Sequence, residues 1–141
     1  LEAYKIGKTA LNLSEKINSA SENAMVNYLF GANILHWVSH QRKNSRYQRK
    51  AIEDGLEGGN YTAAAYGIFS LLLGLFLTGH HLDEVEAEYE TFASTLKRID
   101  QFVYKDNVLP GIFKPLRQLQ GKLPSSTSFD SDDSFSGLDC R

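Results

Sequence analysis

The hydrophobic positions of this chain recur at intervals of three and four residues, which is the spacing of one face of an α-helix. In the first segment, Ile6, Ala10, Leu13 and Ile17 follow this spacing. No long run alternates apolar with polar residues, as a half-buried strand would. The pattern therefore predicts an all-α fold with helices at about residues 3–17, 19–40, 45–56, 61–77, 83–99 and 110–120.

Turn and capping residues mark the ends of these segments. Gly58, Gly59 and Asn60 follow the third segment and Gly79 follows the fourth. Glycine and asparagine tolerate the left-handed conformation that ends many helices. Residues suited to a cap or to a first helical turn are expected at three of the helix starts. They are Ser19 or Ser21 in the second segment, Asp83 in the fifth and Pro110 in the sixth.

The fourth segment, residues 61–77, is uncharged and apolar around its whole circumference. A helix on a protein surface keeps one polar face, so this helix is expected to be covered on every side by protein or by lipid. At 1.5 Å per residue it is about 25 Å long, which is shorter than a bilayer core of about 30 Å. Protein is the preferred environment, and the alternative is a membrane-associated adaptor that uses residues 61–77 as an apolar span.

A long apolar helix, a short turn and a charged helix occur in this order twice. A shift of 40 residues places Leu35 on Leu75 and His40 on His80. A period near 40 residues lies within the range of two-helix solenoid repeats, in which each inner helix contacts both neighbouring repeats. We therefore expect an α-solenoid fragment of about three helix pairs over residues 1–123.

The same shift places a basic third helix on an acidic fifth helix, so stacked repeats would bring opposite charges together. Exposed ion pairs contribute only about 0–1 kcal/mol each, and burial of apolar side chains must supply most of the stability. The predicted inter-repeat pairs are Lys43 with Asp83, Arg46 with Glu86 and Lys50 with Glu90.

The net charge bears on the class of protein, and the composition of the last segment bears on the domain organisation. A net charge of −2 argues against a dedicated nucleic-acid-binding protein. Residues 124–141 hold four Asp and one Arg among many serines, a composition typical of a disordered tail or linker. The single cysteine, Cys140, fits a reducing compartment, and a cytoplasmic location is expected.

Two groups of histidines are candidates for metal binding. His36 and His40 are spaced as in the HExxH motif, but Trp37 stands where that motif requires glutamate. A packing or turn role is therefore expected for them, and no metal or other cofactor is expected. A small metal-dependent helical enzyme remains an alternative, and its second candidate group is His80, His81, Asp83 and Glu84.

The third helix carries a basic face, and such a face can contact phosphates or anionic lipids. No aromatic residues are interleaved with these charges, as they are on a single-stranded nucleic-acid platform. A solvated face or the pairing described above is therefore preferred. The basic residues are Arg42, Lys43, Arg46, Arg49 and Lys50.

Three stretches of the chain resemble the helical region of very large signalling proteins. In that family a serine/threonine-kinase-like domain and an AAA-type ATPase module precede a tetratricopeptide-like helical array. GAF and histidine-kinase or cyclase output domains often follow. The matching stretches are ILHWVSHQRK at 34–43, GLEGGNYTAAAYGIF at 55–69 and FLTGHHLDEVEAEY at 76–89.

The resemblance implies a tetratricopeptide-like segment of a longer protein, with no catalytic residue of its own. The expected role is a regulatory and interaction segment of a large intracellular signal-transduction kinase or ATPase. Its expected partners are domains of the same chain or other signalling proteins, and not nucleic acid. The family-like packing positions are His36, Trp37, His40, Gly55, Asn60, Tyr66, Gly79 and Leu82.

Overall fold

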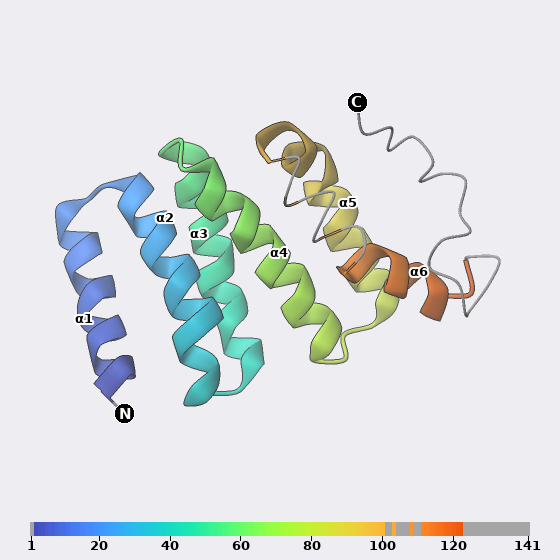
Figure 1. The fold of residues 1–141 in the computed structure, drawn as a ribbon, viewed down its shortest axis with the longest axis horizontal. Helices are drawn as coiled ribbons and strands as arrows, with labels where there is room; N and C mark the ends of the chain where they lie inside the picture. Colours follow the sequence, from blue (N-terminus) through green and yellow to red (C-terminus); the bar gives the residue numbers. More distant parts are fainter. Residues whose placement is uncertain (1, 101–102, 104–107, 109–110, 123–141) are drawn as a thin grey trace.

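The computed structural model describes residues 2–100, 103, 108 and 111–122. These residues form helices and turns and no strand, which confirms the prediction of an all-α fold. The first five α-helices lie side by side in chain order and alternate in direction, and the short last helix packs beside the fifth (Figure 1). The helices are α1 Glu2–Ile17, α2 Ala20–Leu29, α3 Ser45–Glu57, α4 Tyr61–Leu77, α5 Leu82–Ile99 and α6 Lys114–Leu119.

The apolar helix α4 has the bounds that the sequence predicts, and it lies between α3 and α5 (Figure 1). Ile68, Leu71 and Leu72 are at most 1% exposed. The middle of this helix is therefore buried among other helices of the same chain, whereas Tyr61 and Leu77 at its two ends are exposed. Within the described residues, no helix is both long enough and apolar enough to span a bilayer.

Buried apolar residues form two clusters, and α3 contributes to both. The larger cluster joins α3, α4 and α5 to residues that follow α5, and the smaller joins α1 to α3 and the segment after α2. The larger cluster consists of Ile52, Ala65, Ile68, Leu71, Leu72, Tyr89, Ala93, Leu96, Val103, Val108 and Ile112. The smaller consists of Leu11, Phe30, Leu35 and Tyr47.

The second helix is where the structure differs most from the prediction. A continuous helix to about His40 is wrong, because α2 ends at Leu29. A π-helical turn, Phe30–Ile34, and a 3-10 turn, Leu35–Trp37, follow it.

Burial of two apolar side chains explains the π-helical turn. The Leu35 N–H donates to the Phe30 carbonyl, five residues earlier. In an α-helix these two side chains would point about 140° apart, whereas both are buried in the smaller cluster here. Gly31 then packs closely on α3, since a Cβ at that position would lie 2.6 Å from Nε2 of Gln48.

The remaining helices follow the prediction with small shifts. The bounds of α1, α3 and α5 each differ by one residue from the predicted ones. The last helix, α6, begins at Lys114 and carries Pro115 in its first turn. Pro110 and the tail at residues 124–141 lie outside the described residues.

Candidate protein-interaction site

An ion pair joins α3 to α5, between residues other than those that the repeat pattern predicts. Arg49 Nη1 lies 2.8 Å from Glu88 Oε1. The two residues are 39 positions apart, and a difference of one residue from the 40-residue shift turns a helical side chain by about 100°. Among the described residues, no ion pair links Lys43, Arg46 or Lys50 with Asp83, Glu86 or Glu90.

Lys50 is paired within its own helix. Its Nζ lies 2.8 Å from Oδ1 of Asp54 and 3.7 Å from Oε2 of Glu53. The hydrogen bond to Asp54 is the main cause of the raised pKa of Lys50. Asp54 is a buried carboxylate, so this ion pair stabilises a charge that would otherwise be costly inside the protein.

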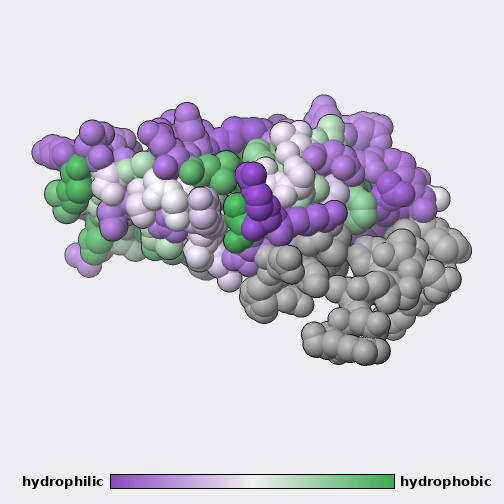
Figure 2. Space-filling view, turned by 90° about the horizontal axis from the view of Figure 1, so that it is seen from above, coloured by the Kyte–Doolittle hydropathy of each residue, from purple (hydrophilic) through white to green (hydrophobic). Residues whose placement is uncertain are grey.

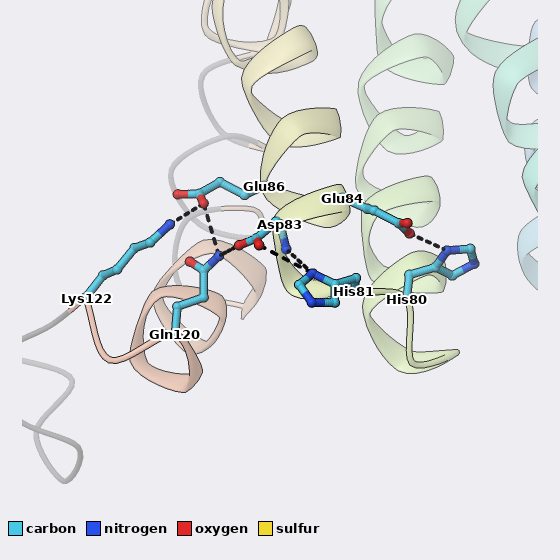
Figure 3. Close-up of polar contacts among 7 residues, drawn as sticks. All are labelled: His80, His81, Asp83, Glu84, Glu86, Gln120 and Lys122. Atoms are coloured by element: carbon cyan, nitrogen blue, oxygen red, sulfur yellow. Dashed lines mark hydrogen bonds and ion pairs between the residues drawn. The ribbon is translucent and has the colours of Figure 1, made fainter.

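Glu86 lies at the centre of a polar cluster that fixes α6 and residue 122 to α5 (Figure 3). Its carboxylate accepts hydrogen bonds from Nη1 of Arg117 and Nε2 of Gln120, each at 3.0 Å, and forms an ion pair with Lys122. The hydrogen bonds from Lys122 and Gln120 are the main causes that lower the pKa of Glu86 from 4.5 to about 2. The cluster therefore acts as a structural clamp between α5 and the segment from α6 to residue 122.

The histidines at the start of α5 have local partners (Figure 3). Nδ1 of His80 lies 3.3 Å from Oε2 of Glu84. Nδ1 of His81 accepts from the Asp83 N–H at 3.4 Å and so caps α5, while Asp83 lies in the first turn. In the part of the chain that the structure describes, no three His, Cys, Asp or Glu residues are grouped so as to hold a metal ion.

The other two histidines lie in the segment that connects α2 to α3. The His36 ring is 4.8 Å from the Trp37 ring, measured between centroids. Nδ1 of His40 accepts from the Arg42 N–H at 3.2 Å and caps the 3-10 turn Gln41–Asn44.

The start of α2, the end of α3 and the start of α4 meet at one junction. Asn60 Oδ1 accepts from the Ala63 N–H at 3.1 Å and caps α4, while Asn60 Nδ2 donates to the Ser21 carbonyl at 3.0 Å. A Cβ at Gly58 would lie 2.9 Å from the backbone carbon of Ala20. The helix backbones therefore approach one another too closely for a side chain at position 58.

The other family-like positions take packing and turn roles. A Cβ at Gly55 would lie 2.9 Å from the Asn60 carbonyl oxygen. Tyr66 stacks on Tyr28 of α2 at 5.8 Å, and burial, with a smaller contribution from Tyr66, raises the pKa of Tyr28. Gly79 ends α4 with φ +72°, and Leu82 is the half-buried first residue of α5.

A groove opens between the start of α1, the segment after α2 and the start of α3. It consists of two adjoining hollows of about 380 and 410 Å³, which share Tyr4 and Val38. The apolar hollow is lined by Ala3, Tyr4, Asn33, Ile34, Trp37 and Val38. The basic hollow is lined by Tyr4, Leu35, Val38, Ser39, Lys43, Arg46 and Tyr47.

The cations of this groove have no acidic partner within the described residues, where neither Lys43 nor Arg46 forms an ion pair with a carboxylate. Arg46 is held in place by Tyr47, because its Nη2 donates to the Tyr47 hydroxyl at 2.6 Å and its guanidinium carbon lies 4.5 Å from the ring centroid. The groove therefore offers positive charge beside exposed apolar surface.

A second exposed apolar surface runs along α1. The residues that α1 buries are Gly7, Leu11 and Ser14, whereas the apolar stripe of Ile6, Leu13 and Ile17 is 57–68% exposed. Figure 2 shows hydrophobic residues on the outer side of the α1 end, which lies at the left as in Figure 1.

The sequence does not indicate the groove in advance. Tyr4 and Val38 belong to separate segments, and Val38 follows the π-helical and 3-10 turns, neither of which the periodicity predicts. Lys43 and Arg46 are recognisable as part of a basic face, but their apolar neighbours are not.

The chain was compared with protein-family models, with curated proteins and with solved structures. No family model, no curated protein and no solved structure matches it.

Proposed function

We propose that this chain is a non-catalytic, tetratricopeptide-like interaction segment of a large intracellular signalling kinase or ATPase. It binds partner proteins or couples neighbouring modules of its own chain. The observation that carries the proposal is the outward-facing stripe of α1, where three large aliphatic side chains are mostly exposed. Apolar surfaces that face water in this way mark sites of contact with another protein segment.

The arrangement of the helices supports a repeat protein. Two pairs, α2 with α3 and α4 with α5, repeat the order of an apolar helix followed by a charged one. In a stacked array each repeat contacts its neighbours, and the exposed stripe of α1 is placed where another helix would pack. Its three residues have the spacing of one helix face, which suits a helical partner.

The link to signalling kinases and ATPases rests on the three stretches that resemble that family. Two residues of the second stretch have roles that fit a packing motif, since Asn60 joins α4 to α2 and Gly55 lies against Asn60. The resemblance supports the type of parent protein, and the exposed stripe supports the role in binding.

Site-specific photocrosslinking tests this proposal. A photoreactive phenylalanine analogue at Leu13 is compared with the same analogue at Asn12, an exposed polar position one residue away. In extract of the native cells, position 13 is expected to yield one defined adduct with a module of the parent chain or a signalling protein. Ile17→Glu in the same protein should abolish that adduct. Identical adducts from positions 12 and 13, or none from position 13, would contradict the proposal.

A further inference from the structure

The groove at the α1 end combines two chemistries that a single peptide can satisfy. We propose that it binds an acidic segment with an aromatic anchor, and that the occupant is residues 128–135 of a second copy of this chain. This inference rests on the proposed role as an interaction segment and names a partner for one surface of it.

The apolar hollow provides the site for the anchor. Trp37 is 77% exposed and Val38 is 37% exposed, and both line the hollow together with Ile34. Tryptophan is among the residues that most often dominate binding energy at interfaces. An aromatic side chain inserted here would cover apolar surface that now faces water.

The basic hollow provides the charge. Lys43 and Arg46 line it, and within the described part of the chain neither has a carboxylate partner. The contacts with Tyr47 hold the Arg46 guanidinium beside the hollow before any ligand binds. Such preorganisation reduces the entropy that binding would cost, and a carboxylate is the group that matches a guanidinium best.

Residues 128–135 have the complementary chemistry. The segment reads SFDSDDSF, with three aspartates between Phe129 and Phe135 and no basic residue. Phe129 and Asp130 are adjacent, as are the apolar and basic hollows that share Tyr4 and Val38. Charge complementarity of this kind favours encounter and fixes the orientation of the bound segment.

The geometry of the molecule favours a second copy as the source of the segment. The groove lies at the α1 end, whereas residue 122, after which the acidic segment follows, is clamped to Glu86 of α5. These two places lie at opposite ends of the row of helices (Figure 1). A neighbouring copy can present its segment without having to cross α2, α3 and α4.

Fluorescence of Trp37, the only tryptophan in the chain, tests the inference directly. A synthetic peptide of residues 127–137 is titrated into the full chain, kept dilute enough to be monomeric. A saturable change in the emission of Trp37 is expected, and it should weaken as salt is raised because exposed charges are screened. The double variant Lys43→Glu, Arg46→Glu and a peptide with its aspartates replaced by asparagine should each bind about tenfold more weakly or worse.

Two controls keep the test specific. Lys16→Glu reverses an exposed charge of α1 outside the groove and should leave the peptide affinity unchanged. Lys43→Glu alone removes one cation and spares the contact between Arg46 and Tyr47, so it tests the site even if the double variant folds poorly. A circular dichroism spectrum establishes that each variant remains helical.

Three outcomes would overturn the inference. The first is the absence of a saturable emission change, and the second is a peptide affinity of the Lys43→Glu variant equal to that of the native chain. The third is a native chain that does not bind added peptide but whose Trp37 emission changes when residues 124–141 are deleted. The last would assign the segment to its own chain. None of them affects the photocrosslink at position 13, so failure here is distinguishable from failure of the proposed function.

Discussion

Single residues decide how closely the helices of this protein approach one another. The turn after α3 contains Gly58, Gly59 and Asn60, and each has a separate task. Gly58 admits the backbone of α2, Gly59 adopts φ +71°, and Asn60 caps α4 while holding the Ser21 carbonyl. The sequence predicts that these residues end a helix, but a contact between residues 58 and 20 leaves no periodic signal along the chain.

Alanine substitutions at the two glycines separate close packing from backbone conformation. Gly58→Ala forces a methyl group against the α2 backbone, so we expect a loss of about 1–3 kcal/mol of stability. Faster hydrogen exchange is expected at the Asn23 amide, which donates to the Ser19 carbonyl, and at the amides that follow it in α2. Gly59→Ala has open space around it but a left-handed conformation, which costs about 1–2 kcal/mol and should leave those amides protected.

The two glycine variants are compared by urea unfolding and by exchange of individual amides. If Gly58→Ala is as stable as the native chain, or if both variants expose the start of α2 equally, the close approach described here is incorrect.

At the scale of elements, helices with strong periodicity were predictable and their interruptions were not. The bounds of α4 follow from an uncharged and largely apolar run between Asn60 and Thr78. The end of α2 at Leu29 does not, because the π-helical turn results from burying Phe30 and Leu35 together against α1 and α3. That requirement comes from the tertiary structure, and local sequence patterns do not record it.

The clamp between α5 and α6 predicts a dependence on pH. The pKa of Glu86 is lowered in the folded protein from 4.5 to about 2, so the carboxylate stabilises the docked α6 above pH 4.5. This contribution is lost as the pH falls from about 4.5 towards 2. The protection of the α6 amides, taken as the intrinsic exchange rate divided by the observed rate at each pH, should therefore fall over that interval.

Substitutions at two glutamates test the assignment to Glu86. Glu86→Gln should lower the protection of the α6 amides at neutral pH and remove most of the acid dependence of that protection. Glu90→Gln serves as the control, because Glu90 is exposed on the same helix and makes none of the contacts of the clamp. An unchanged pH profile in Glu86→Gln would assign the effect to another group.

At the scale of the whole molecule, stability is divided between two apolar clusters that share α3. The larger cluster surrounds α4, while the smaller holds α1 through Leu11. The order of the helices follows from the sequence pattern, but their exact stacking does not. Arg49 and Glu88 meet at a separation of 39 residues, which differs by one from the repeat inferred from the sequence.

Truncating a side chain of the larger cluster should destabilise more helices than truncating a side chain of the smaller cluster. Leu72→Ala removes a fully buried side chain next to α3 and α5 and is expected to cost about 2–5 kcal/mol, with faster exchange in α3, α4 and α5. Leu11→Ala should accelerate exchange mainly in α1, because each helix in a row contacts its neighbours.

Leu77→Ala is the matched control for Leu72→Ala, since Leu77 lies at the end of α4 but is 67% exposed. This substitution should change the free energy of unfolding by less than about 0.5 kcal/mol. A loss of exchange protection across all helices in Leu11→Ala would mean that the two clusters unfold as one.

The π-helical turn has a further consequence for how this protein can change. A π-helical turn carries one residue more than the α-helical turn it replaces, so deletion of Ala32 would allow α2 to continue as a regular helix. Phe30 and Leu35 would then be four residues apart and only about 40° apart around a regular helix, so both could stay in the smaller cluster and the residues after them would keep their orientation. Loss of the codon for Ala32 is therefore the single-residue deletion that this segment should tolerate best, because it keeps the faces that line the groove and that pack on α3.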